Sequence, residues 1–357
     1  MDRKKLRDLG IQIGKLPPGE KNCITDVKGV RVGHLTLMKE LLDGEVVRTG
    51  VTAVLPHGGN LFREKVIATS YVINGFGKTT GLVQVEELGL LESPIMLTNT
   101  FGVPAVTQGT LQYMLKNNPE IGDTTGTINI VVGECNDSYL NSIRLFPVTP
   151  EDAVKAIESA SEDQAKEGAV GAGTGMVCFG YKGGIGASSR VVTNEGASYT
   201  VGCLVLSNFG KREDFRYWQY SDRTEEPDYL TDGSIMIVLA TDAPLGERQL
   251  KRLAKRATIG LGRTGSHASH GSGDIVIAFS TAKTVSHFSD QQQEVIQQIR
   301  EETTVMNELF QAVTEVTEEA ILNSLTKATT TTGRKGRLVN ELPYNFLEKS
   351  GVTVESE

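Results

Sequence analysis

The sequence predicts an α/β protein whose sheets are covered by helices. Short apolar runs of the length of buried strands recur along the chain. Between them, apolar residues repeat at the three- and four-residue spacing of amphipathic helices. The chain has 357 residues, 39% of them hydrophobic, which is enough for one large core or two modest ones. These observations favour layers of helices packed on sheets.

The apolar runs define the expected strands, at residues 51–55, 95–98, 128–132, 199–206, 235–240 and 275–279. One helical stripe contains Leu250, Leu253, Ala254, Ala257 and Leu261, and a second contains Met306, Leu309, Phe310, Val313, Ala320 and Ile321. The charged segment 211–233, which includes Pro227, separates two of the most apolar strands. It is expected to be an exposed connection, the usual place for a proteolytic nick.

Composition argues against several classes of protein. Acidic residues outnumber basic ones by 44 to 36, and the basic residues are dispersed, so a nucleic-acid partner is not expected. No apolar segment follows the charged N-terminus and no eighteen apolar residues run together, so we expect no membrane partner. The cysteines, Cys23, Cys135, Cys178 and Cys203, form no CxxC pair, which disfavours a zinc site or a disulfide framework and fits the cytoplasm.

Three motifs suggest other chemistry, but each lacks a required part. The glycine-rich segment 171–186 has Met176 where a dinucleotide fingerprint needs a small residue, and no GK[ST] follows, so tight turns explain it better. His267 and His270 form an HxxH pair without a third ligand, as expected of surface or turn histidines. Ser280 begins an S-x-x-K match at the end of a predicted strand, without the accompanying motifs of penicillin-recognising enzymes.

Asp232, Gly233 and Ser234 come directly before an apolar strand. An Asp-Gly pair is typical of a hairpin turn. The alternative is chemical: Gly233 has no Cβ, so the Ser234 hydroxyl can approach the Gly233 carbonyl carbon, and an N-to-O acyl shift followed by hydrolysis would break the bond between them. Ser234 would then carry a free α-amine, whose ordinary pKa near 8 suits a general base for its own hydroxyl.

Ser272 and Asp274 stand two residues apart in the segment His-Gly-Ser-Gly-Asp, before another apolar strand. In an extended segment both side chains lie on one face and can form a serine-to-carboxylate relay. The same segment is also typical of a turn, and the spacing alone favours the turn.

Taken together, the motifs resemble the L-aminopeptidase/D-esterase family, which includes the β-peptidyl aminopeptidases. The likeness extends over nearly the whole chain, with landmarks at residues 24–34, 50–62, 131–141, 171–190, 206–210, 232–245 and 271–281. It implies an αββα sandwich, two sheets lying between outer helix layers. It also implies a single hydrolase domain, 1–357, that cuts itself into an α chain, 1–233, and a β chain, 234–357.

By position, the resemblance assigns roles to individual residues. Ser234 matches the nucleophile, and Ser272 and Asp274 match the pair that orients the new α-amine. Asn208 matches the oxyanion-hole donor, although by itself it reads as a strand-end turn asparagine. Glu134 matches the carboxylate that binds the substrate's ammonium group, although by itself it reads as a solvated strand-end glutamate. The family's substrate-binding tyrosine corresponds to Tyr139, or its place is taken by Asn136.

The implied activity is the release of N-terminal amino acids from small peptides, amides or esters with a free N-terminal amine, through an acyl-enzyme on Ser234. The resemblance implies no metal and no organic cofactor, and suggests a homo-oligomer, a tetramer of αβ units. Two alternatives stay open. One is an acyl transferase that passes the acyl group to an amine, as the ornithine acetyltransferases do with a threonine nucleophile. The other is an uncleaved relative that only binds a small molecule.

Overall fold

Two stacked β-sheets form the centre of the protein. The computed structural model describes residues 3–194, 196–217, 233–293 and 295–344. Within these residues the larger sheet has the strand order β4-β3-β12-β11-β10-β9 and the smaller β1-β2-β5-β6. The larger sheet consists of β3 (Glu64–Gly75), β4 (Leu90–Leu91), β9 (Gly184–Asn194), β10 (Ala197–Asn208), β11 (Ser234–Thr241) and β12 (Gly273–Ser286). The smaller consists of β1 (Arg31–Glu40), β2 (Val46–Leu55), β5 (Ile95–Asn99) and β6 (Val131–Cys135).

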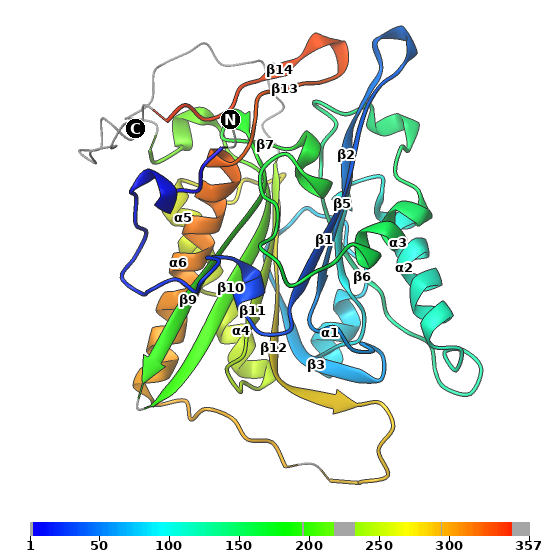
Figure 1. The fold of residues 1–357 in the computed structure, drawn as a ribbon, viewed down its shortest axis with the longest axis vertical. Coiled ribbons are helices and arrows are strands. Elements are labelled where there is room, and N and C mark those ends of the chain that lie inside the picture. The colour runs from blue at the N-terminus through cyan, green and yellow to red at the C-terminus, as the bar shows by residue number, and fades with distance from the viewer. Residues whose placement is uncertain (1–2, 195, 218–232, 294, 345–357) are drawn as a thin grey trace.

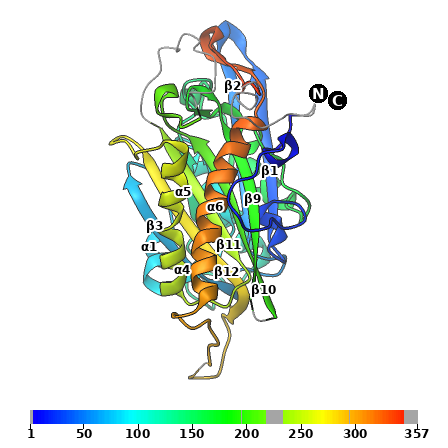
Figure 2. The ribbon, with the colours of Figure 1, turned by 90° about the vertical axis from the view of Figure 1, so that its left-hand side faces the viewer.

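Helices cover the outer face of each sheet. On the larger sheet lie α4 (Glu247–Ala254), α5 (Ala257–Thr264) and α6 (Thr304–Thr326), which stand in front of it in Figure 2. On the smaller sheet lie α2 (Val103–Asn117) and α3 (Pro150–Glu158), on the right in Figure 1. Helix α1 (Leu82–Leu88) packs beside β3 and β4. The order helix, sheet, sheet, helix confirms the αββα sandwich.

Three apolar cores hold the layers together. One lies under α4, α5 and α6 and includes Ile235 and Ile237 of β11. The second lies between the two sheets and includes Met236 and Val238, the alternate residues of the same strand. The third lies between the smaller sheet and α2 and α3. Because β11 is buried on both faces, it reads as a continuous apolar run rather than an alternating one.

Most of the expected strands appear, with informative differences. The run 128–132 forms a strand three residues later, as β6 from Val131, because pairing with β5 begins at Val131. β12 continues past Ser280 to Ser286, so Ser280 does not end its strand. The stripe that begins at Leu250 belongs to two helices, since α4 ends at Ala254 and α5 begins at Ala257.

The connection that starts at Lys211 is less exposed than expected where the structure describes it. Phe215 is buried in the core under α6 and stacks on Phe179, with ring centroids 4.8 Å apart. Arg212 is buried beside it and donates a hydrogen bond to the Gly180 carbonyl. Residues 218–232 of this connection lie outside the described residues.

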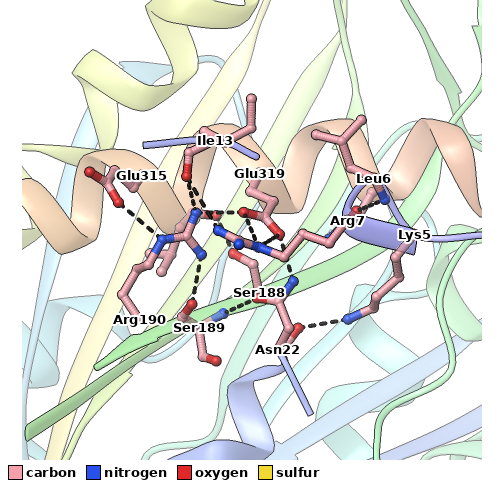
Figure 3. Close-up of polar contacts among 12 residues, drawn as sticks. Lys5, Leu6, Arg7, Ile13, Asn22, Ser188, Ser189, Arg190, Glu315 and Glu319 are labelled. Carbon is pink, nitrogen blue, oxygen red and sulfur yellow. Dashed lines mark hydrogen bonds and ion pairs between the residues drawn. The ribbon is translucent and has the colours of Figure 1, made fainter. Parts of the chain in front are cut away.

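A network of buried charges fastens the N-terminal segment to α6 and β9 (Figure 3). The fully buried guanidinium of Arg190 pairs with Glu315 at 3.0 Å and with Glu319 at 2.5 Å. Arg7 and Asn22 complete the cluster through hydrogen bonds to Glu319. Buried charges are tolerated only when paired in this way, so the cluster fixes the position of the chain start against the helix.

No helix within the described ranges has both the length and the apolar character that a bilayer crossing requires.

Candidate active site

Ser234 is the first residue of β11 and lies between two neighbouring strands. It is opposite Asn208 in the antiparallel pairing with β10, and level with Gly273 in the parallel pairing with β12. Its exposed fraction is only 6%. Alternation along β11 places its side chain on the same face as Met236, toward the space between the sheets. The apolar strand therefore holds this serine at its start, in a nearly dry position.

The backbone amide of Gly273 points at the bond before Ser234. It donates to the Gly233 carbonyl oxygen at 3.3 Å and to the Ser234 Oγ at 3.2 Å. A hydrogen bond from a fixed amide polarises that carbonyl and stabilises negative charge that develops on its oxygen. One N–H group thus contacts both the hydroxyl and the carbonyl that would react in an acyl shift.

Ser272 and Asp274 are in direct contact. The Ser272 hydroxyl donates to Asp274 Oδ1 at 2.6 Å, while Oδ2 is buried without a hydrogen-bond partner among the described residues. Burial raises the pKa of Asp274 to about 6, and the Ser272 hydroxyl and the Ile235 amide partly oppose this shift. Since Asp274 is level with Ile235, the carboxylate lies beside the first two residues of β11.

Asn208 is held at both ends of its side-chain amide. Its Oδ1 accepts a hydrogen bond from the Val177 N–H at 2.9 Å, and its Nδ2 donates to the Asn136 carbonyl at 3.0 Å. A primary amide has two N–H bonds, so one remains for another acceptor. Facing side chains of an antiparallel pair lie on the same side of the sheet, which places this amide next to the Ser234 side chain.

Glu134 reaches the same region from the other sheet. It lies on β6, is 3% exposed, and accepts hydrogen bonds from the Lys78 amide at 2.9 Å and from the Thr100 hydroxyl. A carboxylate has about four acceptor positions, so further donors can be bound. Glycine at 133 leaves room for the Met236 side chain of β11, because a Cβ there would lie 2.4 Å from Met236 Cε.

Gly77 lies close both to Glu134 and to Gly273, the residue whose amide contacts Ser234. A Cβ added to Gly77 would lie 3.4 Å from the Gly273 Cα and 3.8 Å from Glu134 Oε1. Glu134 and Gly273, whose amide contacts Ser234, therefore both lie within 4 Å of one point beside Gly77.

The two candidates for the tyrosine position lie in different surroundings. Asn136 is exposed, and its carbonyl accepts the hydrogen bond from Asn208. Tyr139 lies under the guanidinium of Arg337, which is 4.5 Å from its ring centroid. The structure thus brings Asn136, rather than Tyr139, against Asn208.

The remaining motifs lie in ordinary structural positions. The segment 171–186 forms close turns and strand packing, with Gly171 and Gly184 at positive φ. His267 and His270 are exposed. Ser280 is buried and donates to the Ala243 carbonyl at 2.7 Å. Among the described residues, no three His, Cys, Asp or Glu side chains are grouped to hold a metal ion.

Sequence reasoning did not find the groups that support these side chains. Thr100 and the Lys78 amide hold Glu134, and the Gly273 amide contacts Ser234. Backbone amides leave no side-chain signal in a sequence. Thr100 is one threonine among many, and only the pairing of β5 with β6 brings the end of β5 beside Glu134.

Comparison with known proteins points to one peptidase family. The sequence pattern of peptidase family S58 matches residues 22–339. The β-peptidyl aminopeptidase BapA of Sphingosinicella microcystinivorans is 41% identical over 368 residues, an alignment that covers 95% of this chain and 90% of that protein. A solved structure from Pyrococcus horikoshii has a TM-score of 0.91 and 48% identity, and the match covers 98% of this chain and all of that one.

A second solved structure carries a functional description. It is the L-aminopeptidase/D-Ala-esterase/amidase of Ochrobactrum anthropi, described as a prototype of the serine aminopeptidases with a variant of the Ntn hydrolase fold. Its TM-score is 0.90 at 35% identity, over 98% of this chain and 99% of that one. The fold and these relatives define an aminopeptidase of the N-terminal-nucleophile (Ntn) hydrolase class. The chain belongs to peptidase family S58.

Proposed function

We propose that this enzyme activates itself by cutting the Gly233–Ser234 bond and then removes N-terminal amino acids through an acyl-enzyme on Ser234. The observation that carries the proposal is the Gly273 amide, which contacts both the Gly233 carbonyl oxygen and the Ser234 hydroxyl. Its support is chemical: the nucleophile, the carbonyl and a donor for the developing negative charge are in one place.

In the self-cleavage step, Ser234 Oγ attacks the Gly233 carbonyl carbon while its proton passes to nearby acceptors. The Ser272–Asp274 pair is the nearest proposed acceptor, and the Gly273 amide stabilises the oxyanion. The C–N bond then breaks, the nitrogen of Ser234 takes a proton, and an ester remains. Water hydrolyses this ester, which leaves a carboxylate on Gly233 and a free α-amine on Ser234.

In turnover, the free α-amine accepts the proton of the Ser234 hydroxyl as Oγ attacks the substrate carbonyl. The spare N–H of Asn208 binds the oxyanion, and Asp274, through its unpaired Oδ2, and Ser272 hold the ammonium that forms. That ammonium protonates the leaving amine or alcohol. Water then attacks the ester and releases the amino acid.

The proposed substrates are small peptides, amides or esters with a free N-terminal amine. Glu134 supports this part of the proposal, since it is a nearly buried carboxylate close to Gly273, whose amide contacts the nucleophile, and such a carboxylate is a strong anchor for an ammonium group. The activities in the names of the relatives, β-peptidyl aminopeptidase and L-aminopeptidase/D-Ala-esterase, are of this kind.

We also propose that the enzyme works in the cytoplasm and assembles as a tetramer of αβ units. The four cysteines are buried and unpaired, which fits a reducing compartment such as the cytoplasm. The family likeness suggests assembly as a tetramer of αβ units, which sedimentation of the purified enzyme would test.

Intact mass and N-terminal sequencing of the purified protein test the proposal. Scaled from 38.6 kDa for the whole chain, the fragments should be about 25 and about 13 kDa, and the smaller should begin at Ser234. Ser234→Ala should stay uncut and inactive. The matched control is Ser280→Ala, a buried serine away from the site, which should be cut normally. An active wild-type enzyme that remains a single chain would overturn the proposal.

A further inference from the structure

Lys182 is a fully buried lysine that the mechanism above does not use. It lies on the short strand β8 (Tyr181–Lys182), which pairs with β7 (Val177–Cys178). Its ammonium group donates to three backbone carbonyls: those of Gly173 at 3.0 Å, Met176 at 2.8 Å and Gly183 at 2.7 Å. A buried cation that binds three carbonyls at once fixes the chain around it.

One of these carbonyls belongs to the peptide unit that contacts Asn208. The Met176 carbonyl accepts from Lys182, and the N–H on the other side of the same peptide bond, that of Val177, donates to Asn208 Oδ1 at 2.9 Å. The Gly183 amide also donates to the Met176 carbonyl, at 3.1 Å. Because a peptide unit is planar, holding its oxygen also holds the direction of its N–H.

The direction of that N–H decides which end of the Asn208 amide faces the nucleophile. With Oδ1 held by Val177, Nδ2 must lie on the other side, where it contacts the Asn136 carbonyl and has one N–H to spare. A flip by 180° would instead present Oδ1 to a developing oxyanion and repel it. A cation on the Met176 carbonyl also polarises the peptide and strengthens the Val177 N–H as a donor.

The other anchor of Asn208 lies near the same charge. Asp137 follows Asn136 and is fully buried. Burial lowers the pKa of Lys182 to about 7, and Cys178 and then Asp137 partly oppose this shift. Its Oδ1 accepts from Asn141 at 3.0 Å. The Val177 N–H thus adjoins the carbonyl that Lys182 binds, and the Asn136 carbonyl directly precedes the buried Asp137.

We propose that Lys182 is a positioning residue that sets the orientation of the Asn208 amide through the Met176–Val177 peptide, so that Nδ2 faces the oxyanion. The inference rests on the proposed role of Asn208. Lys182 then affects catalysis through the Asn208 side chain, rather than through a general contribution to folding.

A double-mutant cycle tests this assignment on the cleaved enzyme with an aminoacyl p-nitroanilide. Asn208→Ala should lower kcat roughly a hundredfold, as the loss of an oxyanion donor does. Lys182→Met should lower kcat roughly tenfold or more with KM little changed, since misplacement of a catalytic group acts on the transition state. In the Asn208→Ala background, Lys182→Met should have almost no further effect on kcat.

Lys5→Met is the matched control. Lys5 is also buried and also binds a backbone carbonyl, that of Asn22 at 2.6 Å, but it pairs with Glu167 in the N-terminal cluster. This variant should keep kcat. The inference is overturned if Lys182→Met lowers kcat by the same factor in the wild-type and Asn208→Ala backgrounds. It is also overturned if Lys182→Met leaves the wild-type kcat unchanged. A wild-type kcat in Asn208→Ala refutes the oxyanion role itself, so the two failures are distinguishable.

Val177→Pro gives a second route if Lys182→Met does not fold. Proline removes the N–H that reaches Asn208 and leaves Lys182 in place. It should lower kcat in the wild-type background and not in Asn208→Ala. Unchanged kcat in Val177→Pro overturns the inference independently.

Discussion

Replacing Glu134 by glutamine should weaken the enzyme's preference for substrates with a free amine. The carboxylate is nearly buried and already accepts hydrogen bonds from the Lys78 amide and the Thr100 hydroxyl. A bound ammonium would add a charge-assisted hydrogen bond, typically worth about 1.5–3 kcal/mol. At about 1.4 kcal/mol for each factor of ten, its loss lowers kcat/KM roughly tenfold to a hundredfold.

Acetylating the substrate should cost the wild-type enzyme more than this. The acetyl group removes the charge, adds bulk, and leaves the buried carboxylate without its partner. The combined loss in kcat/KM should exceed roughly a hundredfold. In Glu134→Gln the penalty for acetylation should shrink, because the partner of the ammonium is already gone.

The assay measures kcat/KM for an aminoacyl p-nitroanilide and for its N-acetyl form. The enzymes compared are the wild type, Glu134→Gln and a control variant, Glu92→Gln. Glu92→Gln is the matched control, because Glu92 is a buried glutamate that accepts the Asn129 amide at 3.0 Å and pairs with Lys65. It should leave the ratio between the two substrates unchanged. Equal wild-type rates on the two substrates would refute the ammonium anchor and indicate a general amidase or esterase.

Three further predictions follow from the site and the fold. In the cleaved Ser272→Ala variant, kcat should be lower by roughly tenfold or more with little change in KM, because Asp274 loses a charge-assisted hydrogen bond. A kcat equal to that of the wild type would show that the segment is only a turn. The rate of self-cleavage of freshly refolded precursor should fall as the pH is lowered through about 6. Burial raises the pKa of Asp274 to about 6, and below that pH the neutral carboxyl no longer accepts a proton. A self-cleavage rate independent of pH from 5 to 7 would contradict this prediction. Arg190→Met should lower the free energy of unfolding by about 3–5 kcal/mol in denaturant titrations, because two buried glutamates lose their main partner. Arg31→Met, at the exposed pair with Glu162, should cost about 1 kcal/mol or less. Equal losses would show that the buried network contributes no more than the exposed pair.

Local properties of the sequence are enough to predict most strands, and they bring the site residues into view only as one of two interpretations. The run that became β11 is apolar throughout because both of its faces are buried, and such a run is visible without any knowledge of the fold. The contact between Ser272 and Asp274 is one of the two interpretations that their two-residue spacing allows; the spacing alone favours a turn, and the family resemblance assigns the pair. Helix α6 was likewise predicted from its apolar spacing.

The boundaries of elements depended on their neighbours. β6 starts at Val131 because its pairing with β5 starts there, although the apolar run begins earlier. The stripe from Leu250 is continuous in sequence, yet the chain turns between α4 and α5, and periodicity alone does not detect such a break.

What only the tertiary structure decided is how distant residues meet. Glu134 reaches the Ser234 region because two sheets pack face to face, and Asn208 is held by Val177 of β7 and by Asn136, which follows β6. Sequence periodicity records which face of a strand is buried, but not which strand lies across from it. The packing of the sheets sets those distances, and with them the position of every group around the nucleophile.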